Sequence, residues 1–183
     1  PDILDFKAVA LLRSELRSLR FTDGAATAGK FGQSVKKNSQ LEQGPQAQKI
    51  QQTILNAVLA NLEFEMVARP LIVRTPLVAR YEPSMEYGSH VDNAVMSGRP
   101  PIRSDMSFTL FHEDPEKYDG GELVIESTYG EQEIKLPAGA LVLYPTSALH
   151  RVAEVTRGQR LVAVSWVQSM IRDPARRELL HEL

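Results

Sequence analysis

The apolar residues of this chain change their spacing about a third of the way along the sequence. Before residue 63 they recur at helical intervals, which predicts one amphipathic helix over residues 5–19 and a second that begins at Pro45. Proline suits the first helical position because the N–H that it lacks has no helical partner there. The polar stretch 21–46 is expected to be a loop or a short hairpin. The buried stripe of the second helix is expected to contain Ile50, Ile54, Val58 and Leu62.

After residue 70, short apolar runs with the spacing of strands take over, and turns that contain Gly or Pro separate several of them. Many short strands favour a sandwich or a jelly roll. Helices confined to one end of the sequence are expected to buttress one face of the sheet, so the predicted fold class is α+β. The expected strands are 71–74, 77–81, 107–111, 122–125, 133–136, 140–144 and 160–167.

Length and composition narrow the class of protein. With 183 residues, of which 43% are hydrophobic, the chain is expected to form a single domain. We divide that domain, 1–183, into helical support over about 1–62, a jelly-roll core over about 64–171 and the start of a C-terminal helix over about 174–183. A net charge of −2 gives no bulk attraction to nucleic acid or to anionic membranes, and no apolar run is long enough to span a bilayer.

The sequence contains no Cys, which restricts its metal chemistry. Neither a disulfide framework nor a thiolate metal site is possible, so any metal must be held by nitrogen and oxygen ligands. The first residues show no signal-peptide pattern. The expected compartment is therefore the cytoplasm, whose reducing conditions suit a ferrous ion.

His90, Asp92 and His150 form a candidate metal site. Residues two apart in an extended segment face the same way, so His90 and Asp92 can reach one point at a strand end. His150, about sixty residues later, can reach that point only through the fold. Two imidazoles and one carboxylate are the ligand set of non-haem Fe(II) oxygenases. Zinc accepts the same donors, so a hydrolytic zinc site is an alternative, and a jelly-roll binding module without catalysis is another.

Arg160 lies ten residues beyond His150 at the start of an apolar strand. A guanidinium on an inward-facing strand position needs an anion, because an unpaired buried charge is costly. One interpretation is an ion pair with an Asp or Glu of this chain. The other is a bidentate contact to a ligand carboxylate, for which guanidinium geometry is suited. The residues that share the parity of Arg160 are Val162, Val164 and Trp166.

The remaining polar and aromatic candidates have weaker patterns. Tyr81 and Tyr87 can each donate a hydrogen bond to a co-substrate or fill core at a strand edge, and for Tyr87 the core interpretation is favoured. Thr109 and Leu123 can line a pocket, but we expect them simply to pack in the core. The other two histidines serve as controls: His112, next to acids and a turn, is predicted to be solvated, and His181, near the end of the chain, is assigned no role.

Several separated motifs, taken together, resemble one known family. The chain is similar to bacterial PKHD-type hydroxylases, which are Fe(II)/2-oxoglutarate dioxygenases related to prolyl 4-hydroxylases. The resemblance covers most of the chain, with Ser84 standing where the family usually has Gly. The motifs that carry it are residues 23–30, 38–41, 80–94, 119–123, 141–145, 149–152, 156–160 and 166–169.

The resemblance implies a double-stranded β-helix (jelly roll) in which His90, Asp92 and His150 bind Fe(II). It implies that Arg160 anchors the carboxylate of 2-oxoglutarate and that Tyr81 makes a second contact to this co-substrate. The implied reaction uses O2 and releases succinate and CO2, with ascorbate as a further candidate cofactor. The substrate is expected to be a prolyl or lysyl residue of a peptide, or a small metabolite such as a siderophore component. The Gly- and Pro-containing loop 93–104 is expected to close over it.

Overall fold

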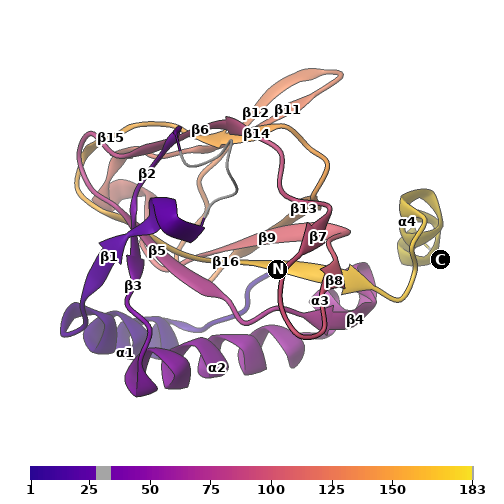
Figure 1. Cartoon of the computed structure of the whole chain (residues 1–183), viewed down its shortest axis with the longest axis horizontal. Helices are drawn as coiled ribbons and strands as arrows, with labels where there is room; N and C mark the ends of the chain where they lie inside the picture. Colours follow the sequence, from indigo (N-terminus) through magenta and orange to yellow (C-terminus); the bar gives the residue numbers. More distant parts are fainter. Residues whose placement is uncertain (28–33, 183) are drawn as a thin grey trace.

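Two antiparallel sheets form the framework of the computed structural model, which describes residues 1–27 and 34–182 (Figure 1). The larger sheet has seven strands in these residues, with β16 near its centre. Its order is β1 (Phe21–Asp23), β3 (Ser39–Leu41), β5 (Leu77–Tyr81), β16 (Arg160–Ser169), β9 (Met106–Phe111) and β13 (Leu141–Pro145), with β4 (Pro70–Val73) also paired to β16. The smaller sheet has the order β12 (Gly130–Ile134), β11 (Leu123–Ser127), β14 (His150–Val152), β6 (Glu86–His90) and β2 (Lys36–Lys37).

This arrangement confirms the predicted α+β double-stranded β-helix. The seven predicted strands correspond to β4, β5, β9, β11, β12, β13 and β16. Within the stretch 21–46, β1 and β3 pair antiparallel with Phe21 opposite Leu41, as expected for a short hairpin. The part of that stretch from 28 to 33, which includes Lys30, lies outside the described residues.

Helices cover the outer face of the larger sheet, as Figure 1 shows for α1 (Phe6–Arg17) and α2 (Pro45–Leu59). Asp5 caps α1 by accepting a 2.8 Å hydrogen bond from the backbone N–H of Ala8, and Pro45 opens α2 as predicted. No helix in residues 1–27 and 34–182 is both long and apolar enough to cross a membrane. The remaining helical elements are α3 (Leu62–Ala68), α4 (Pro174–Glu182) and the 3-10 turns η1 (Gly24–Thr27) and η2 (Pro115–Lys117).

The predicted buried stripe of the second helix is wrong at its last residue. Helix α2 ends at Leu59, and Asn61 then caps α3 by accepting a 2.9 Å hydrogen bond from the N–H of Phe64. The break between the two helices resets the helical spacing. Leu62 is therefore 72% exposed, and Phe64, 1% exposed, takes the buried place.

The core divides into two clusters because the residues of β16 alternate between the faces of the larger sheet. Leu161, Ala163 and Val167 pack in the cluster under the helices, where Phe64 and Phe108 meet edge to face with ring centroids 5.9 Å apart. The opposite face of the larger sheet turns toward the smaller sheet, where Val162 is buried. The residues of β16 that lie on the same face as Arg160 therefore point into the space between the two sheets, as predicted. The buried members of this second cluster are Ala79, Tyr81, Phe111, Val152, Val155 and Val162.

Two short ribbons complete the strand pairing. β10 (Asp119–Gly120) pairs with β15 (Val155–Arg157), and β7 (Val95–Met96) pairs with β8 (Ile102–Arg103). The second ribbon lies within the predicted loop 93–104, so that loop is a hairpin. The guanidinium of Arg74 holds it by donating to the backbone carbonyls of Met96, Ser97 and Pro100 at 3.4, 2.6 and 3.2 Å.

Candidate metal centre

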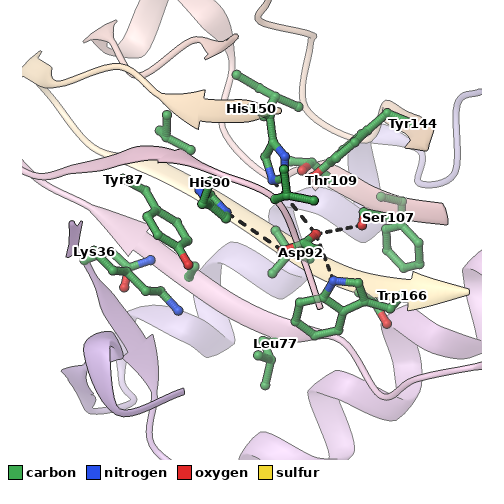
Figure 2. A pocket seen from close by; sticks show the side chains of 18 of the residues that line it. Lys36, Leu77, Tyr87, His90, Asp92, Ser107, Thr109, Tyr144, His150 and Trp166 are labelled. Carbon is green, nitrogen blue, oxygen red and sulfur yellow. Dashed lines mark hydrogen bonds and ion pairs between the residues drawn. The ribbon is translucent and has the colours of Figure 1, made fainter. Parts of the chain in front are cut away.

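The fold brings His90, Asp92 and His150 to one point at the edge of the smaller sheet (Figure 2). His90 is the last residue of β6, His150 is the first residue of β14, and the two lie opposite each other in the strand register. Asp92 follows His90 by two residues. One potential ligand atom from each of the three side chains lies within 4.8 Å of the other two.

Both histidines are oriented by backbone carbonyls. Nδ1 of His90 lies 2.8 Å from the carbonyl oxygen of Gly88, and Nδ1 of His150 lies 2.9 Å from that of Ala148. Each Nδ1–H donates to its carbonyl, which leaves the Nε2 lone pair directed toward the other two side chains. Burial, together with the neighbouring His150, lowers the pKa of His90 to about 4. The His90 imidazole is therefore neutral at physiological pH and can act as a ligand.

One oxygen of Asp92 is held by two donors. Its Oδ2 accepts hydrogen bonds from Ser107 Oγ at 2.7 Å and from Trp166 Nε1 at 2.9 Å. The closest approaches to the histidines are 3.8 Å between Oδ1 and His90 Nε2 and 3.9 Å between Oδ2 and His150 Nε2. Both distances are longer than the donor–acceptor distance of a hydrogen bond. The three side chains therefore face a common point without being hydrogen-bonded to one another.

Arg160 is buried without an acidic partner. Its side chain is 1% exposed, and its Nε and Nη1 atoms have no hydrogen-bond partner. Among the described residues, no Asp or Glu carboxylate lies within 4.0 Å of its guanidinium. Its Cζ atom lies over two aromatic rings, 5.0 Å from the ring centroid of Tyr81 and 5.6 Å from that of Phe111. The ion-pair interpretation of Arg160 is therefore wrong.

A cavity of about 300 Å³ joins the three converging side chains to Arg160. Tyr81 lines it and is 4% exposed, and burial raises the pKa of its hydroxyl, so it keeps its proton. Tyr87 packs against the core between the sheets, as predicted, but it also lines the cavity and stacks on His90 with ring centroids 3.7 Å apart. Thr109 and Leu123, for which packing was the default, line the cavity too.

Several cavity residues were not predicted from the sequence, and they include Lys36, Asn38, Ser107 and Tyr144. Lys36 gave no signal, since it lies in a polar stretch that resembles a loop. The inward direction of Trp166 follows from the parity that it shares with Arg160 on β16, but its role as a donor to Asp92 was missed, although a buried indole N–H needs an acceptor.

The prediction that His112 is solvated is wrong. Its side chain is 0% exposed, and burial followed by the charge of Arg13 lowers its pKa to about 4. The acids beside it do not mark a solvated turn, because Glu113 and Asp114 each lie 3.0 Å from the Arg13 guanidinium. His181 falls in α4, and its side chain lies outside the described part of the structure.

Comparisons with known proteins agree with this geometry. A sequence model of the 2OG-Fe(II) oxygenase superfamily matches residues 76–168. A PKHD-type hydroxylase of Synechococcus sp. (strain JA-2-3B'a(2-13)) is 52% identical over 184 residues, which cover 100% of this chain and 82% of the relative. The chain belongs to the PKHD-type hydroxylase family. As a PKHD-type hydroxylase it is a dioxygenase that depends on Fe(II) and 2-oxoglutarate.

Solved structures show the same fold at low sequence identity. A prolyl-4-hydroxylase of Pseudomonas putida superposes with a TM-score of 0.61 at 18% identity, covering 93% of this chain and 90% of that one. HygX of Streptomyces hygroscopicus, solved with nickel and 2-oxoglutarate, gives 0.64 at 14% identity, covering 93% and 82%. The PKHD-type hydroxylase described here therefore shares the double-stranded β-helix of 2-oxoglutarate oxygenases.

Proposed function

We propose that His90, Asp92 and His150 hold the Fe(II) of this hydroxylase and that Arg160 binds the distal carboxylate of 2-oxoglutarate. The observation that carries the proposal is the buried guanidinium of Arg160, which has no acidic partner among the described residues and two nitrogen atoms, Nε and Nη1, without a hydrogen-bond partner, in the same cavity as the three converging side chains. A buried cation without an acidic partner is costly, so the site favours an anion supplied from outside the chain. Tyr81, protonated and within 5.0 Å of the guanidinium, is the proposed second contact to 2-oxoglutarate.

The donor set fits the metal. Two imidazoles and one carboxylate suit Fe(II) and leave coordination positions open for other ligands. Fe(II) and 2-oxoglutarate together supply, when bound, the oxidation of a C–H bond to an alcohol by O2, with release of succinate and CO2. Zinc would accept the same three donors. Hydrolysis at a zinc site, however, does not require a co-substrate carboxylate, so it would not explain why Arg160 is buried without an acidic partner.

The protein's own part is positioning and the exclusion of water. The carbonyls of Gly88 and Ala148 fix the tautomers of the histidines, while Ser107 and Trp166 fix Asp92. The Tyr81 hydroxyl donates a hydrogen bond to the co-substrate carboxylate. Apolar side chains complete the walls and keep the site dry, which strengthens each of these contacts. These apolar residues include Leu77, Leu123, Val152 and Val164.

For the substrate we propose a prolyl or lysyl residue of a peptide, with a small metabolite such as a siderophore component as the second candidate. The structural likeness to a Pseudomonas putida protein named as a prolyl-4-hydroxylase supports the first. The likeness to HygX, for which a complex with hygromycin B is known, supports the second. Fold likeness alone does not fix a substrate. Ascorbate as a further cofactor and the cytoplasm as the compartment stay predictions.

Succinate formation tests the reaction. Purified protein with Fe(II), 2-oxoglutarate and O2 should release succinate, and Asp92→Ala should abolish the release because it removes the only anionic donor of the three. Arg157→Met serves as a control, since Arg157 is exposed and pairs with Asp119 at 2.6 Å. Absence of succinate above background from the wild type, with candidate peptides and metabolites present, would contradict the proposal.

Closure of the 93–104 segment over substrate also stays a prediction. Arg74, whose backbone is hydrogen-bonded to β16, ties the β7–β8 hairpin to the larger sheet at three carbonyls, so closure should break or rearrange these hydrogen bonds. Hydrogen exchange of the hairpin amides, compared with and without a bound substrate, measures this. Equal protection in both states would argue against closure.

A further inference from the structure

Arg160 occupies its buried place although no carboxylate in the described part of the chain pairs with it. The rings of Tyr81 and Phe111 lie 5.0 and 5.6 Å from its Cζ atom, and the backbone of Gly121 packs against its aliphatic part. A Cβ atom added at Gly121 would lie only 3.0 Å from Cδ of Arg160. Real Cβ contacts are almost always longer, so this arrangement depends on the missing side chain at position 121.

The β10–β15 ribbon holds Gly121 beside Arg160. Gly121 directly follows β10, and its N–H donates to the carbonyl of Glu154 at 3.3 Å. The partner strand, β15, ends at Arg157, three residues before Arg160. A Cβ atom at the preceding Gly120 would collide with the carbonyl oxygen of Glu154, so Gly120 lets the two backbones approach each other. The ribbon therefore ties Gly121 to the segment that leads into β16.

Three buried side chains would confine a methyl group at position 121. Its closest neighbours would be Val155 Cγ2 at 2.9 Å, Arg160 Cδ at 3.0 Å and Tyr118 Cε2 at 3.1 Å. Each of these residues is at most 1% exposed, so none can turn out into solvent. Val155 packs in the core between the sheets, whereas Arg160 lines the cavity of about 300 Å³. The methyl group would therefore be accommodated by a shift of Arg160 into the cavity.

We propose that Gly121 is a positioning residue for 2-oxoglutarate, because its missing side chain leaves Arg160 far enough back to receive the distal carboxylate. This inference rests on the proposed function, in which Arg160 binds that carboxylate. A guanidinium binds a carboxylate best through two parallel hydrogen bonds, and such a geometry tolerates little displacement. Gly121 does not itself line the cavity, so it acts on the co-substrate through Arg160.

A double-mutant cycle between Gly121 and Arg160 tests the proposal by binding rather than by turnover. Its members are the wild type, Gly121→Ala, Arg160→Met and the double variant, each loaded with Zn(II), which does not support the oxidation. Isothermal titration calorimetry gives the Kd of 2-oxoglutarate, and titration of the metal-free proteins gives the Kd of Mn(II). Gly130→Ala is the matched control for backbone strain, because Gly130 has φ 108° and no described heavy atom within 4 Å of an added Cβ.

The expected effect is confined to the co-substrate. Gly121→Ala should raise the Kd of 2-oxoglutarate about fivefold and change the Kd of Mn(II) by less than about twofold, whereas a merely structural role would weaken both. In the Arg160→Met background the same change should have an effect of less than about twofold, since the guanidinium that it displaces is gone. Gly130→Ala should leave both Kd values unaltered.

Val155→Ala guards against misfolding of the glycine variant. It removes the closest neighbour of the new methyl group but leaves the contact with Arg160, because the backbone of residue 121 fixes where its Cβ atom lies. If Gly121→Ala alone does not fold, it is made together with Val155→Ala and compared with Val155→Ala. The Kd of 2-oxoglutarate should again differ about fivefold between these two proteins.

The contrary results are distinct from one another. An unchanged Kd of 2-oxoglutarate in the folded glycine variant would overturn the proposal. So would an effect that persists at full size in Arg160→Met, an equal loss of metal binding, or failure of both glycine variants to fold, because each would make Gly121 a structural residue. If Arg160→Met leaves the Kd of 2-oxoglutarate unaltered, or the metal-loaded wild type does not bind 2-oxoglutarate, the proposed function is refuted instead.

Discussion

The indole N–H of Trp166 donates a 2.9 Å hydrogen bond to Oδ2 of Asp92. Ser107 Oγ donates to the same oxygen at 2.7 Å, so two donors from adjacent strands of the larger sheet fix a carboxylate that lies beyond the end of β6. Without them Asp92 would be free to rotate away from His90 and His150. The larger sheet therefore fixes the orientation of Asp92, although the three candidate metal-binding side chains come from the smaller sheet and from the segment that follows β6.

Trp166→Phe should weaken metal binding. The change keeps an aromatic ring in the cavity but removes one donor to Asp92, and loss of such a partner typically costs about tenfold or more in metal affinity. Titration with Mn(II) followed by electron paramagnetic resonance gives the Kd. Ser107→Ala should act in the same direction. Ser127→Ala, which removes an exposed hydroxyl that donates to the carbonyl of Gly130 at 2.9 Å rather than to Asp92, should leave the Kd unchanged. An unaltered Kd in Trp166→Phe would refute the positioning role.

Arg160→Met should separate co-substrate binding from metal binding. Loss of a buried charge-assisted contact is expected to raise the Kd of 2-oxoglutarate by about thirtyfold or more, which corresponds to about 2 kcal/mol. The Kd of Mn(II) should change little. Because the arginine is buried without an acidic partner, the free energy of unfolding of the ligand-free protein should not fall. Equal loss of metal and co-substrate binding, or marked destabilisation, would show that Arg160 is structural.

His112 should make the protein acid-sensitive. Its pKa is about 4 when folded, below the value of about 6.5 that an unfolded histidine has, so the unfolded state binds the proton first as the pH falls. The contribution of His112 is complete above pH 6.5 and is lost progressively down to about pH 4, at a cost of about 2–3 kcal/mol. Urea unfolding at several pH values measures this loss. His112→Phe should have a shallower pH dependence, and parallel curves for the two proteins would contradict the prediction.

Ser84 should be a site of stored backbone strain. It has φ 71°, a left-handed conformation that costs a residue with a side chain about 1–2 kcal/mol, and its N–H donates to the carbonyl of Val155 at 2.9 Å. Ser84→Gly removes the strain but adds freedom to the unfolded chain, so a net gain of about 0.5–1 kcal/mol is expected. Thermal unfolding should show a midpoint about 1–4 °C higher. Ser84→Ala, which retains a Cβ, should show no such gain.

The sequence predicted those parts of the fold whose pattern is local. β16 and β9 contain enough apolar residues to be predicted as strands from the sequence. The alternation of side chains along β16 also correctly predicted that Arg160 and Trp166 face inward. β6 and β14 were not counted among the strands because short segments that end or begin with functional residues have no apolar alternation. Nothing near residue 36 indicated that β2 would pair with β6 and carry a cation into the cavity.

His112 shows why local context can mislead. Its acidic neighbours suggested solvent, but the decisive residue, Arg13, lies 99 positions away on α1, where it binds the backbone carbonyl of His112 and the side chains of both acids. Leu62 was misplaced for a related reason, since the break at the two capping residues Ala60 and Asn61 changes the direction of every later side chain. Both errors concern contacts that only the folded chain defines.

Trp166 is the only tryptophan in the sequence. Its indole is separated from any metal ion held by Asp92 by a single hydrogen-bonded carboxylate. All tryptophan emission of the protein therefore originates at the edge of its metal centre. Intrinsic fluorescence should report the occupancy of that centre in real time, with no label and no exogenous dye.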